Sequence, residues 1–440
     1  MAPKASALVE GTLTSEALQE IAQVAHVDQW IEFKKKYDDI GDSRLWRIHN
    51  DLYDLSDFID KHPGGSMWIA ETRGTDITEA FEVAHVFGDN FGKILTKYHV
   101  RSVENSPRKS PFTFKSDGFY QTLKRRVQKI LKEVGTGPSH QMLLIQDGLF
   151  FSYVTLLLLT AWLGGPWILV VATGLILGMT CSCAHNFFHQ RDNYRMYLGD
   201  LSASHSRDWR ISHMLCHHLF TNSAIDVESS VFLPFINWFV VPDKTWTQLH
   251  LFPMLYPLMY LLTFPVNLVQ RPFFVLKGET PFRLEYVLPY VPLLVFLSFG
   301  LSLVSTILVW FTMHGIAGFW IVFTSLIGTH HHPSVFHDGD YLPKDLDWGI
   351  SQIDTTRDVN KSGNLFLIAT SFGDHLLHHL FPTVDHSKLD YLIPALNETL
   401  TEFAIEYPVA NQWNMVLGMH SQMTRTKPNT HMERRQMRIG

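Results

Sequence analysis

The chain has 440 residues, a net charge of −6 and an 18% share of charged residues. This length leaves room for two or three domains, and a weakly acidic chain without a basic patch argues against a nucleic-acid partner. Histidine is unusually frequent, with 24 residues, many of them in tight clusters. Cys181, Cys183 and Cys216 have neither metal-finger spacing nor a disulfide framework, so we expect structural thiols in a reducing compartment.

The first part of the chain is polar, and its opening residues lack the apolar core of a signal peptide, so we expect it to stay in the cytosol. Residues 1–37 are predicted to be an N-terminal extension and residues 38–105 a small soluble domain. Residues 106–140 are predicted to be a linker that contains a basic amphipathic helix over 119–134. Its position before an apolar stretch favours a membrane-surface anchor over a solvated helix face.

Two long stretches, residues 148–190 and 286–329, contain no Asp, Glu, Lys or Arg. Because a membrane-crossing helix needs about 20 apolar residues, each stretch fits two spans joined by a tight turn. Residues 249–275 are also apolar, but four prolines interrupt them, which predicts interfacial or re-entrant segments. Two hairpins return the chain to the side it left, so the segments beginning near His185 and His330 should lie on the cytosolic side.

The first histidine motif reads His-Pro-Gly-Gly at residues 62–65 and is followed by His85. A six-coordinate haem iron needs one imidazole on each face, and the glycines permit a sharp turn beside the macrocycle. The stretch from Trp46 to His99 resembles cytochrome b5 throughout, including Asp54–Ile59 and Gly74–Phe81. The resemblance implies a non-covalent b-type haem with His62 and His85 as axial ligands, and single-electron transfer. The haem loop is expected at Pro63, Gly64 and Gly65.

Three further histidine clusters occur close to the apolar stretches. On a helix, residues three and four apart share a face, so each cluster presents two or three imidazoles. One zinc ion needs only three or four ligands, so eight imidazoles suggest two metal ions, and imidazole suits iron, zinc and copper. The eight are His185, His189, His213, His217, His218, His375, His378 and His379.

Around these clusters, residues from about 140 to 405 resemble the membrane fatty acid desaturase and hydroxylase family. The matching stretches include Trp209–His213, Leu219–Asn222, Trp348–Gln352 and Thr355–Asp358. The resemblance implies that the eight histidines hold a di-iron centre, with no separate catalytic side chain. It also implies that O2 and a fatty acyl-CoA or acyl-lipid are the substrates.

The two resemblances together predict an α+β haem domain followed by an all-α membrane domain over residues 141–405, with about four spans as two hairpins. The histidine clusters would form a cytosolic cap, and residues 406–440 a cytosolic tail. NADH-cytochrome b5 reductase is the implied electron donor, and the endoplasmic reticulum is the implied membrane. A fatty acyl or lipid hydroxylase stays open as an alternative, as does a haem-binding electron-transfer protein with a non-catalytic desaturase-like domain. A zinc hydrolase fits less well, because hydrolysis needs no electrons.

The family site usually takes one more histidine from the end of the last span, and His332 and His330 are the candidates here. Two positions differ from the family pattern. Asn186 stands where acyl-lipid desaturases often have Asp, which predicts the loss of an outer carboxylate that orients a ligand. His375 stands where front-end desaturases usually have Gln, so the position of the double bond stays open. His386 is expected to be an ordinary polar residue.

Overall fold

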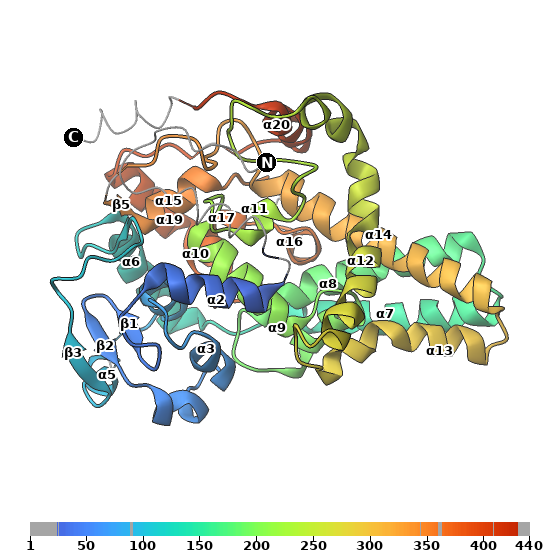
Figure 1. Ribbon diagram of the computed structural model, residues 1–440, viewed down its shortest axis with the longest axis horizontal. Helices are drawn as coiled ribbons and strands as arrows, with labels where there is room; N and C mark the ends of the chain where they lie inside the picture. Colours follow the sequence, from blue (N-terminus) through green and yellow to red (C-terminus); the bar gives the residue numbers. More distant parts are fainter. Residues whose placement is uncertain are drawn as a thin grey trace.

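The computed structural model describes most of the chain, namely residues 24, 26–88, 91–343, 345–359, 363–407 and 409–429. A small module of short strands and helices lies at one end of the molecule, and a group of long helices extends from the other end (Figure 1). A cap of short helices lies between them and contains the histidine clusters. The predicted fold class, an α+β domain followed by a helical membrane domain, is confirmed.

The N-terminal module contains an antiparallel sheet with the strand order β1-β2-β3. Its elements are β1 (Trp46–Ile48), β2 (Asp51–Tyr53), η1 (Ser56–Lys61), α3 (Ser66–Glu71), α4 (Thr78–Ala84), α5 (Phe91–Leu95) and β3 (His99–Ser102). Leu52 in the middle strand pairs with Arg47 on one side and Arg101 on the other. The module has its own apolar core, in which the buried Trp46 indole donates to the Ile69 carbonyl at 2.9 Å. The ring is therefore buried without leaving its N–H unsatisfied.

Helix α2 (Val27–Asp38) precedes this module and packs on the cap. The indole N–H of Trp30 donates to the carbonyl of Ile225 at 3.1 Å. We predicted an N-terminal extension over residues 1–37. Residues 1–23 and 25 lie outside the described residues, but the later part of the extension forms this helix. Its partner is distant in sequence, which is why local pattern did not indicate it.

Helix α6 (Phe119–Val134) is the basic amphipathic helix that we predicted to be a membrane-surface anchor, and this prediction is wrong. Its apolar side chains are buried inside the protein: Phe119, Tyr120, Leu123, Val127 and Leu131. They pack against α15 (Trp348–Thr355) and α19 (Ile393–Glu402). A hydrophobic stripe shows that a helix packs on something, but not whether that partner is lipid or protein.

Four helices in the described part of the chain are long and apolar enough to cross a membrane: residues 140–162, 167–188, 247–276 and 303–325. They correspond to α7 (His140–Trp162), α8 (Trp167–Phe188), η4 (Thr247–Leu251) with α12 (Phe252–Leu276), and α14 (Leu303–Thr329). The number of long helices matches the prediction of about four, although their positions differ in one respect described below.

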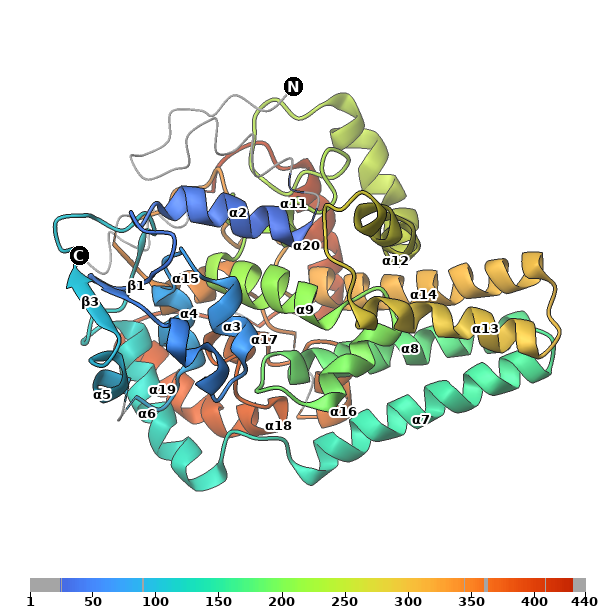
Figure 2. The same cartoon turned by 60° about the horizontal axis from the view of Figure 1, so that its bottom comes forward.

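Helices α7 and α8 form one hairpin, and α13 (Val291–Ser298) and α14 form a second hairpin beside it (Figure 2). The turns of the two hairpins meet, since a Cβ on Gly165 would lie 3.5 Å from the side chain of Leu301, between α13 and α14. The two predicted hairpins are thus present. The first arm of the second hairpin is short, however, because it consists only of η5 (Leu284–Tyr290) and α13.

Helix α12 runs across the direction of the other long helices (Figures 1 and 2). We predicted interfacial or re-entrant segments over residues 249–275, but one helix continues through Pro257, Pro265 and Pro272. Apolar membrane helices tolerate proline. These three prolines are seven and eight residues apart and therefore lie on one side of the helix.

Two glycines allow α8 to approach α14 closely. A Cβ on Gly174 would lie 2.7 Å from the Met313 carbonyl oxygen, and one on Gly178 would lie 2.8 Å from the Cβ of Trp320. Small residues four apart are a common basis of close helix packing in membranes. This packing brings the histidine-bearing end of α8 next to the end of α14, where His330 begins the following segment.

The cap is built from short elements between and after the long helices. They are η2 (Tyr194–Leu201), α9 (Ser206–Trp209), η3 (Arg210–His217), α10 (His218–Phe220), α11 (Val227–Ser230), α15, α16 (Leu365–Thr370), α17 (His375–Leu380), α18 (His386–Leu389), η6 (Asp390–Leu392) and α19. Strand β4 (Phe112–Thr113), from the predicted linker, pairs in parallel with β5 (Leu346–Asp347) in the cap. The linker is therefore attached to the cap over these residues.

Helix α20 (Gln412–Thr424) packs on α12 and α14 through three buried methionines, Met415, Met419 and Met423. Methionine is unbranched and adapts to such irregular surfaces. We predicted a tail over residues 406–440. Residues 430–440 lie outside the described residues, whereas the helical part is packed on the protein.

Candidate haem and metal centres

The two predicted haem ligands face each other across the N-terminal module. The ring centroids of His62 and His85 are 6.1 Å apart, and the ring planes are nearly perpendicular. His62 Nδ1 lies 2.9 Å from the Gly65 carbonyl, and His85 Nδ1 lies 2.9 Å from the Phe81 carbonyl. A carbonyl can only accept, so each Nδ1 carries the proton and each Nε2 is free to bind iron. The residues present fit a haem iron bound on both faces.

Glycine is required beside His62, the first predicted haem ligand. A Cβ on Gly64 would lie 2.9 Å from Cε1 of His62. Gly65 has a φ of 113°, a backbone conformation that residues with a side chain rarely adopt. On the other face, burial lowers the pKa of His85 to about 4, which favours the neutral imidazole that binds metal.

Five imidazoles converge in a first group, which we call site A. They are His185, His189, His213, His218 and His378. All five side chains are buried, and one ring nitrogen of each lies within 4.8 Å of the others. Nε2 of His185 is at the centre, 2.7 Å from Nε2 of His213, 3.0 Å from that of His189 and 3.2 Å from that of His378.

A second group, site B, lies next to the first. It contains His217, His330 and His379, whose ring nitrogens also lie within 4.8 Å of one another. His375 joins this group, because its Nε2 lies 2.7 Å from Nε2 of His330. Every predicted metal ligand therefore belongs to one of the two groups, five in site A and four in site B when His330 is included.

The second histidine cluster contributes to both sites because η3 is a π-helix. In a π-helix, residues five apart share a face. Nε2 of His218 lies 3.0 Å from Nε2 of His213, five residues earlier, and both belong to site A. His217 lies one residue away on a different face and reaches site B. The α-helical spacing assumed from sequence does not separate these histidines in this way.

The spacing between the ring nitrogens fits shared metal ions. Two nitrogens bound to one ion at about 2.0–2.1 Å lie roughly 3.0–3.4 Å apart. In site B, Nε2 of His217 lies 3.1 Å from Nε2 of His330. His330 Nδ1 faces the Thr355 carbonyl at 3.1 Å and His217 Nδ1 faces Asp226 at 2.9 Å, so in the neutral rings both Nε2 atoms present lone pairs. A cation between them removes that repulsion. Nε2 of His379 is buried and has no hydrogen-bond partner among the described residues.

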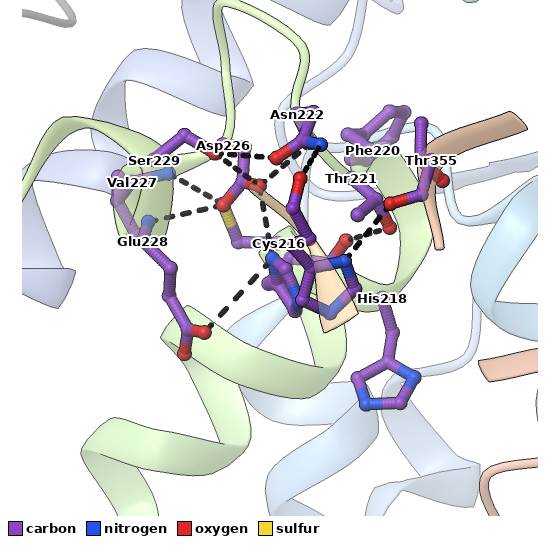
Figure 3. A network of polar contacts seen from close by, with 12 residues as sticks. Cys216, His218, Phe220, Thr221, Asn222, Asp226, Val227, Glu228, Ser229 and Thr355 are labelled. Carbon is purple, nitrogen blue, oxygen red and sulfur yellow. Dashed lines mark hydrogen bonds and ion pairs between the residues drawn. The ribbon is translucent and has the colours of Figure 1, made fainter. Parts of the chain in front are cut away.

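Carboxylates behind the second cluster orient its imidazoles, and Figure 3 shows their network. Asp226 Oδ2 accepts from Nδ1 of His217 at 2.9 Å and from the backbone N–H of Asn222 at 2.8 Å. Glu228 Oε1 lies 3.0 Å from Nδ1 of His213. One loop thus supplies an outer carboxylate to a ligand of each site, an arrangement that fixes the ring and raises its basicity.

The electrostatics of the sites favour metal binding. Burial and the neighbouring imidazoles lower the pKa of His218, His378 and His379 well below the usual range, which keeps these rings neutral. Burial also acts to lower the pKa of His217, but Asp226 and Glu228 outweigh it and raise that pKa. The raised pKa of His217 is therefore due to its two carboxylate neighbours.

Asn186, the departure in the first cluster, has a matched partner. Its Nδ2 donates to Oδ2 of Asp385 at 2.7 Å, and its Oδ1 accepts from the backbone amide of His386 at 3.1 Å. The first cluster itself lacks the carboxylate, as predicted, but Asp385 from a distant part of the chain places a carboxylate beside Asn186. His386, which we expected to be an ordinary polar residue, is buried, and its Nε2 lies 3.1 Å from Nδ1 of the site A ligand His378.

The run of three histidines after α14 divides into three environments. His330 lies in site B. His331 stacks on Trp238 at 3.9 Å between ring centroids. His332 contacts Ser334 Oγ at 2.7 Å and is not among the grouped ligands of either site. The structure thus favours His330 over His332, a choice that the sequence left open.

Residues in the stretches that resemble the desaturase family position the predicted metal ligands. Gln352 Oε1 accepts from Nδ1 of His379 at 3.0 Å, and Asn222 Nδ2 donates to the His330 carbonyl at 2.9 Å. Asp358 Oδ1 accepts from the backbone amide of His375 at 2.6 Å and so caps the start of α17. Sequence reasoning identified these stretches but missed Asp226, Glu228 and Asp385 as partners. For Asp226 and Glu228, the only indication in the sequence was that they follow the second histidine cluster closely.

Comparison with known proteins defines the class of this chain. Residues 160–410 match the fatty acid desaturase family, and residues 29–104 match the cytochrome b5-like haem/steroid binding domain. The chain therefore belongs to the fatty acid desaturase family and carries a cytochrome b5-like domain ahead of it. It is an integral membrane oxidoreductase of the desaturase type, as predicted.

Among individual relatives, cytochrome b5-related protein of Drosophila melanogaster is 40% identical over 401 residues, which cover 90% of this chain and 91% of that protein. Acyl-lipid (8-3)-desaturase of Mortierella alpina is 24% identical over 425 residues, covering 85% of this chain and 91% of the relative. Delta(5) fatty acid desaturase A of Dictyostelium discoideum is 23% identical over 416 residues, covering 85% and 88%. No solved structure matches the chain.

Proposed function

We propose that the chain is a di-iron oxidoreductase of lipid metabolism that uses O2, and electrons delivered through its haem module, to desaturate a fatty acyl chain. One observation carries the proposal: two adjacent groups of buried imidazoles converge at metal-ligand spacing beside a haem module. The two desaturase relatives described above, which align over most of the chain, support the choice of acyl substrate.

Iron suits this site better than zinc. When bound, two irons supply the O2 activation that hydrogen removal from an unactivated acyl C–H bond requires. The chain's own residues bind and orient the metals through His Nε2, while Asp226 and Glu228 hold protons at the Nδ1 atoms behind them. Burial of the ligands excludes water from the metals. A fused haem module has no role in hydrolysis, which argues against a zinc hydrolase.

His62 and His85 would hold a haem iron from both faces, so the bound haem would pass single electrons and would leave no open position for oxygen. NADH-cytochrome b5 reductase is the proposed source of those electrons, and a fatty acyl-CoA or acyl-lipid is the proposed substrate. The haem module and helix α17, which carries His375, His378 and His379, lie on the same side of the long helices (Figure 2). We propose that they face the cytosol together, with the long helices in the endoplasmic reticulum membrane.

Two alternative functions use the same scaffold. A hydroxylase would place oxygen on the acyl chain in place of a second hydrogen removal, and no contact in the site separates the two outcomes. A non-catalytic haem protein is disfavoured, because an idle site has no physical need for four ligands in one group and five in the other with their outer carboxylates retained.

The test is to purify the full chain in detergent and measure iron content, haem absorption and lipid products together. We expect about three irons per chain, one in haem and two outside it, and a reducible b-type spectrum. Unsaturated acyl products that depend on O2 would support desaturation, and hydroxylated products would indicate the alternative. A single iron that stays single after reconstitution, with no zinc bound, would overturn the di-iron proposal.

A further inference from the structure

The end of helix α4 is completed by side chains from outside the haem module. The last carbonyls of a helix have no partner within the helix. Here Lys124 Nζ donates to the carbonyl of Glu82 at 2.7 Å, and Thr383 Oγ1 donates to that of Ala84 at 3.1 Å. A lysine at this end also suits the helix dipole. The residue that follows Ala84 is the haem ligand His85, so this ligand's segment is bound directly to the membrane domain.

A further contact continues the same surface beyond the ligand. Gln128 Nε2 donates to the carbonyl of Val86 at 2.6 Å. Val83 and Val86 are buried in one core with Leu376 and Leu380 of α17. The chain on both sides of His85 therefore packs against the rest of the protein.

Tyr120 connects the end of α4 to the end of α17, which holds the third histidine cluster. Its Oη lies 3.2 Å from the Leu380 carbonyl and 3.5 Å from the Glu82 carbonyl. The side chain is completely buried. Leu380 directly follows His379 of site B, and Thr383 lies four residues after that ligand. Two side chains therefore join a haem-ligand segment to a metal-ligand helix.

The segment of the other haem ligand is also packed on the membrane domain. A Cβ on Gly65 would lie 2.7 Å from the carboxylate oxygens of Asp192. Arg210 pairs with Asp192 at 2.6 Å, and its guanidinium lies over the Trp68 ring at 4.8 Å. Trp68 in turn donates to the Gly64 carbonyl at 3.1 Å. Both sides of the haem module are held in place.

The Glu82 carboxylate at this contact stays ionised at physiological pH. Burial acts to raise the pKa of Glu82, but the hydrogen bond from His49 and the charge of Lys124 bring it down to about 2. Lys124 and Glu82 form an ion pair at 3.2 Å that is largely shielded from water. Separation of the module would break this pair and leave charges in a partly apolar surface, which is costly.

We propose that the haem module delivers electrons while it stays docked, and that Tyr120 and Thr383 are positioning residues that hold the His85 segment against the helix of His378 and His379. This inference rests on the proposed function. In the step, haem iron(II) loses one electron and becomes iron(III), while one non-haem iron(III) gains it and becomes iron(II). No bond forms or breaks and no proton moves. The alternative is that the haem module detaches from the membrane domain and moves on its linker between electron uptake and delivery.

The test uses the full-length, haem-loaded chain with Tyr120→Phe, Thr383→Val and the double variant. Each substitution removes a hydroxyl and preserves shape. Tyr391→Phe and Thr401→Val, at exposed positions, are matched controls. Neither Tyr120 nor Thr383 contacts the haem ligands themselves, so the haem spectrum and reduction potential should not change in any variant.

The first readout needs no non-haem iron. Hydrogen exchange of the backbone amides around residues 82–86 should be about tenfold faster in the double variant, since two hydrogen bonds are lost. The second readout is haem reoxidation after photoreduction without O2, in the iron-loaded chain. We expect it to slow about tenfold or more, because electron delivery depends on geometry.

The outcomes separate the possible failures. Faster exchange with unchanged reoxidation would show a purely structural role and overturn the positioning role. Unchanged exchange and unchanged reoxidation would overturn it too. An iron-loaded parent chain whose haem is not reoxidised would overturn the proposed function itself, and this is seen before any variant is compared. Slower reoxidation with the haem potential unchanged supports docked delivery.

Discussion

The carboxylate of Asp226 lies 2.9 Å from Nδ1 of His217, and both side chains are buried. This contact opposes the effect of burial and raises the pKa of His217. It also leaves the proton on Nδ1, so Nε2 points into site B as a lone pair. The orientation of one metal ligand thus depends on a residue nine positions later in the chain.

Asp226→Asn should lower the iron content of site B and the desaturation rate by about 10–100-fold, because an amide provides a weaker acceptor without charge. Iron per chain and acyl product formation measure this. Asp243→Asn, at an exposed position, is the control. Full iron content and parental activity in Asp226→Asn would show that the carboxylate does not support the ligand.

The Asn186–Asp385 pair predicts a charge swap. Asn186→Asp would place two buried carboxylates at hydrogen-bond distance and should reduce the free energy of unfolding by about 1–3 kcal/mol. The double variant Asn186→Asp/Asp385→Asn should recover most of that loss, because the donor and acceptor exchange places. Thermal unfolding in detergent measures both. A double variant no more stable than the single one would argue against the pairing.

Substitution of His330 and substitution of His332, both after α14, should have very different effects on bound iron. His330→Ala removes a site B ligand and should abolish activity and reduce bound iron. His332→Ala leaves both groups intact and should retain the iron. Iron analysis of the two purified variants, with haem absorbance as a folding check, tests this. Equal iron loss in both variants would contradict the assignment.

His85→Ala should abolish the b-type haem spectrum and haem-dependent turnover, since one axial ligand is lost. The non-haem iron should stay, because sites A and B do not include this residue. His420→Ala, on the exposed side of α20, is the matched control. A normal bis-histidine haem spectrum in His85→Ala would refute the assignment.

The metal-free chain should lose stability as the pH falls. The pKa of His218, His378 and His379 is lowered in the folded chain from its usual value of 6.5, so the unfolded chain binds more protons below that pH. The contribution is therefore present above pH 6.5 and lost as the pH falls below it. Unfolding temperatures of chelator-treated protein at pH 7.5 and 5.5 measure the effect. A higher unfolding temperature at pH 5.5 would contradict it.

The fold class and the existence of clustered imidazoles could be predicted, because apolar length and helical spacing are local properties. The division of ligands between two sites could not, since it depends on the π-helical turn of η3. The partner of α6 was misjudged because amphipathicity does not identify what covers the apolar face. The carboxylate beside Asn186 comes from Asp385, 199 residues away, which no local pattern reveals.

The π-helical turn has a consequence for how the metals are acquired. Because adjacent residues His217 and His218 belong to different sites, one short backbone segment would hold ligands of both proposed ions. α17 does the same with His378 and His379. Ordering these segments around a first ion therefore places ligands for the second. Occupancy should be cooperative, with chains holding either two ions or none, and partly loaded chains should be rare at every iron concentration.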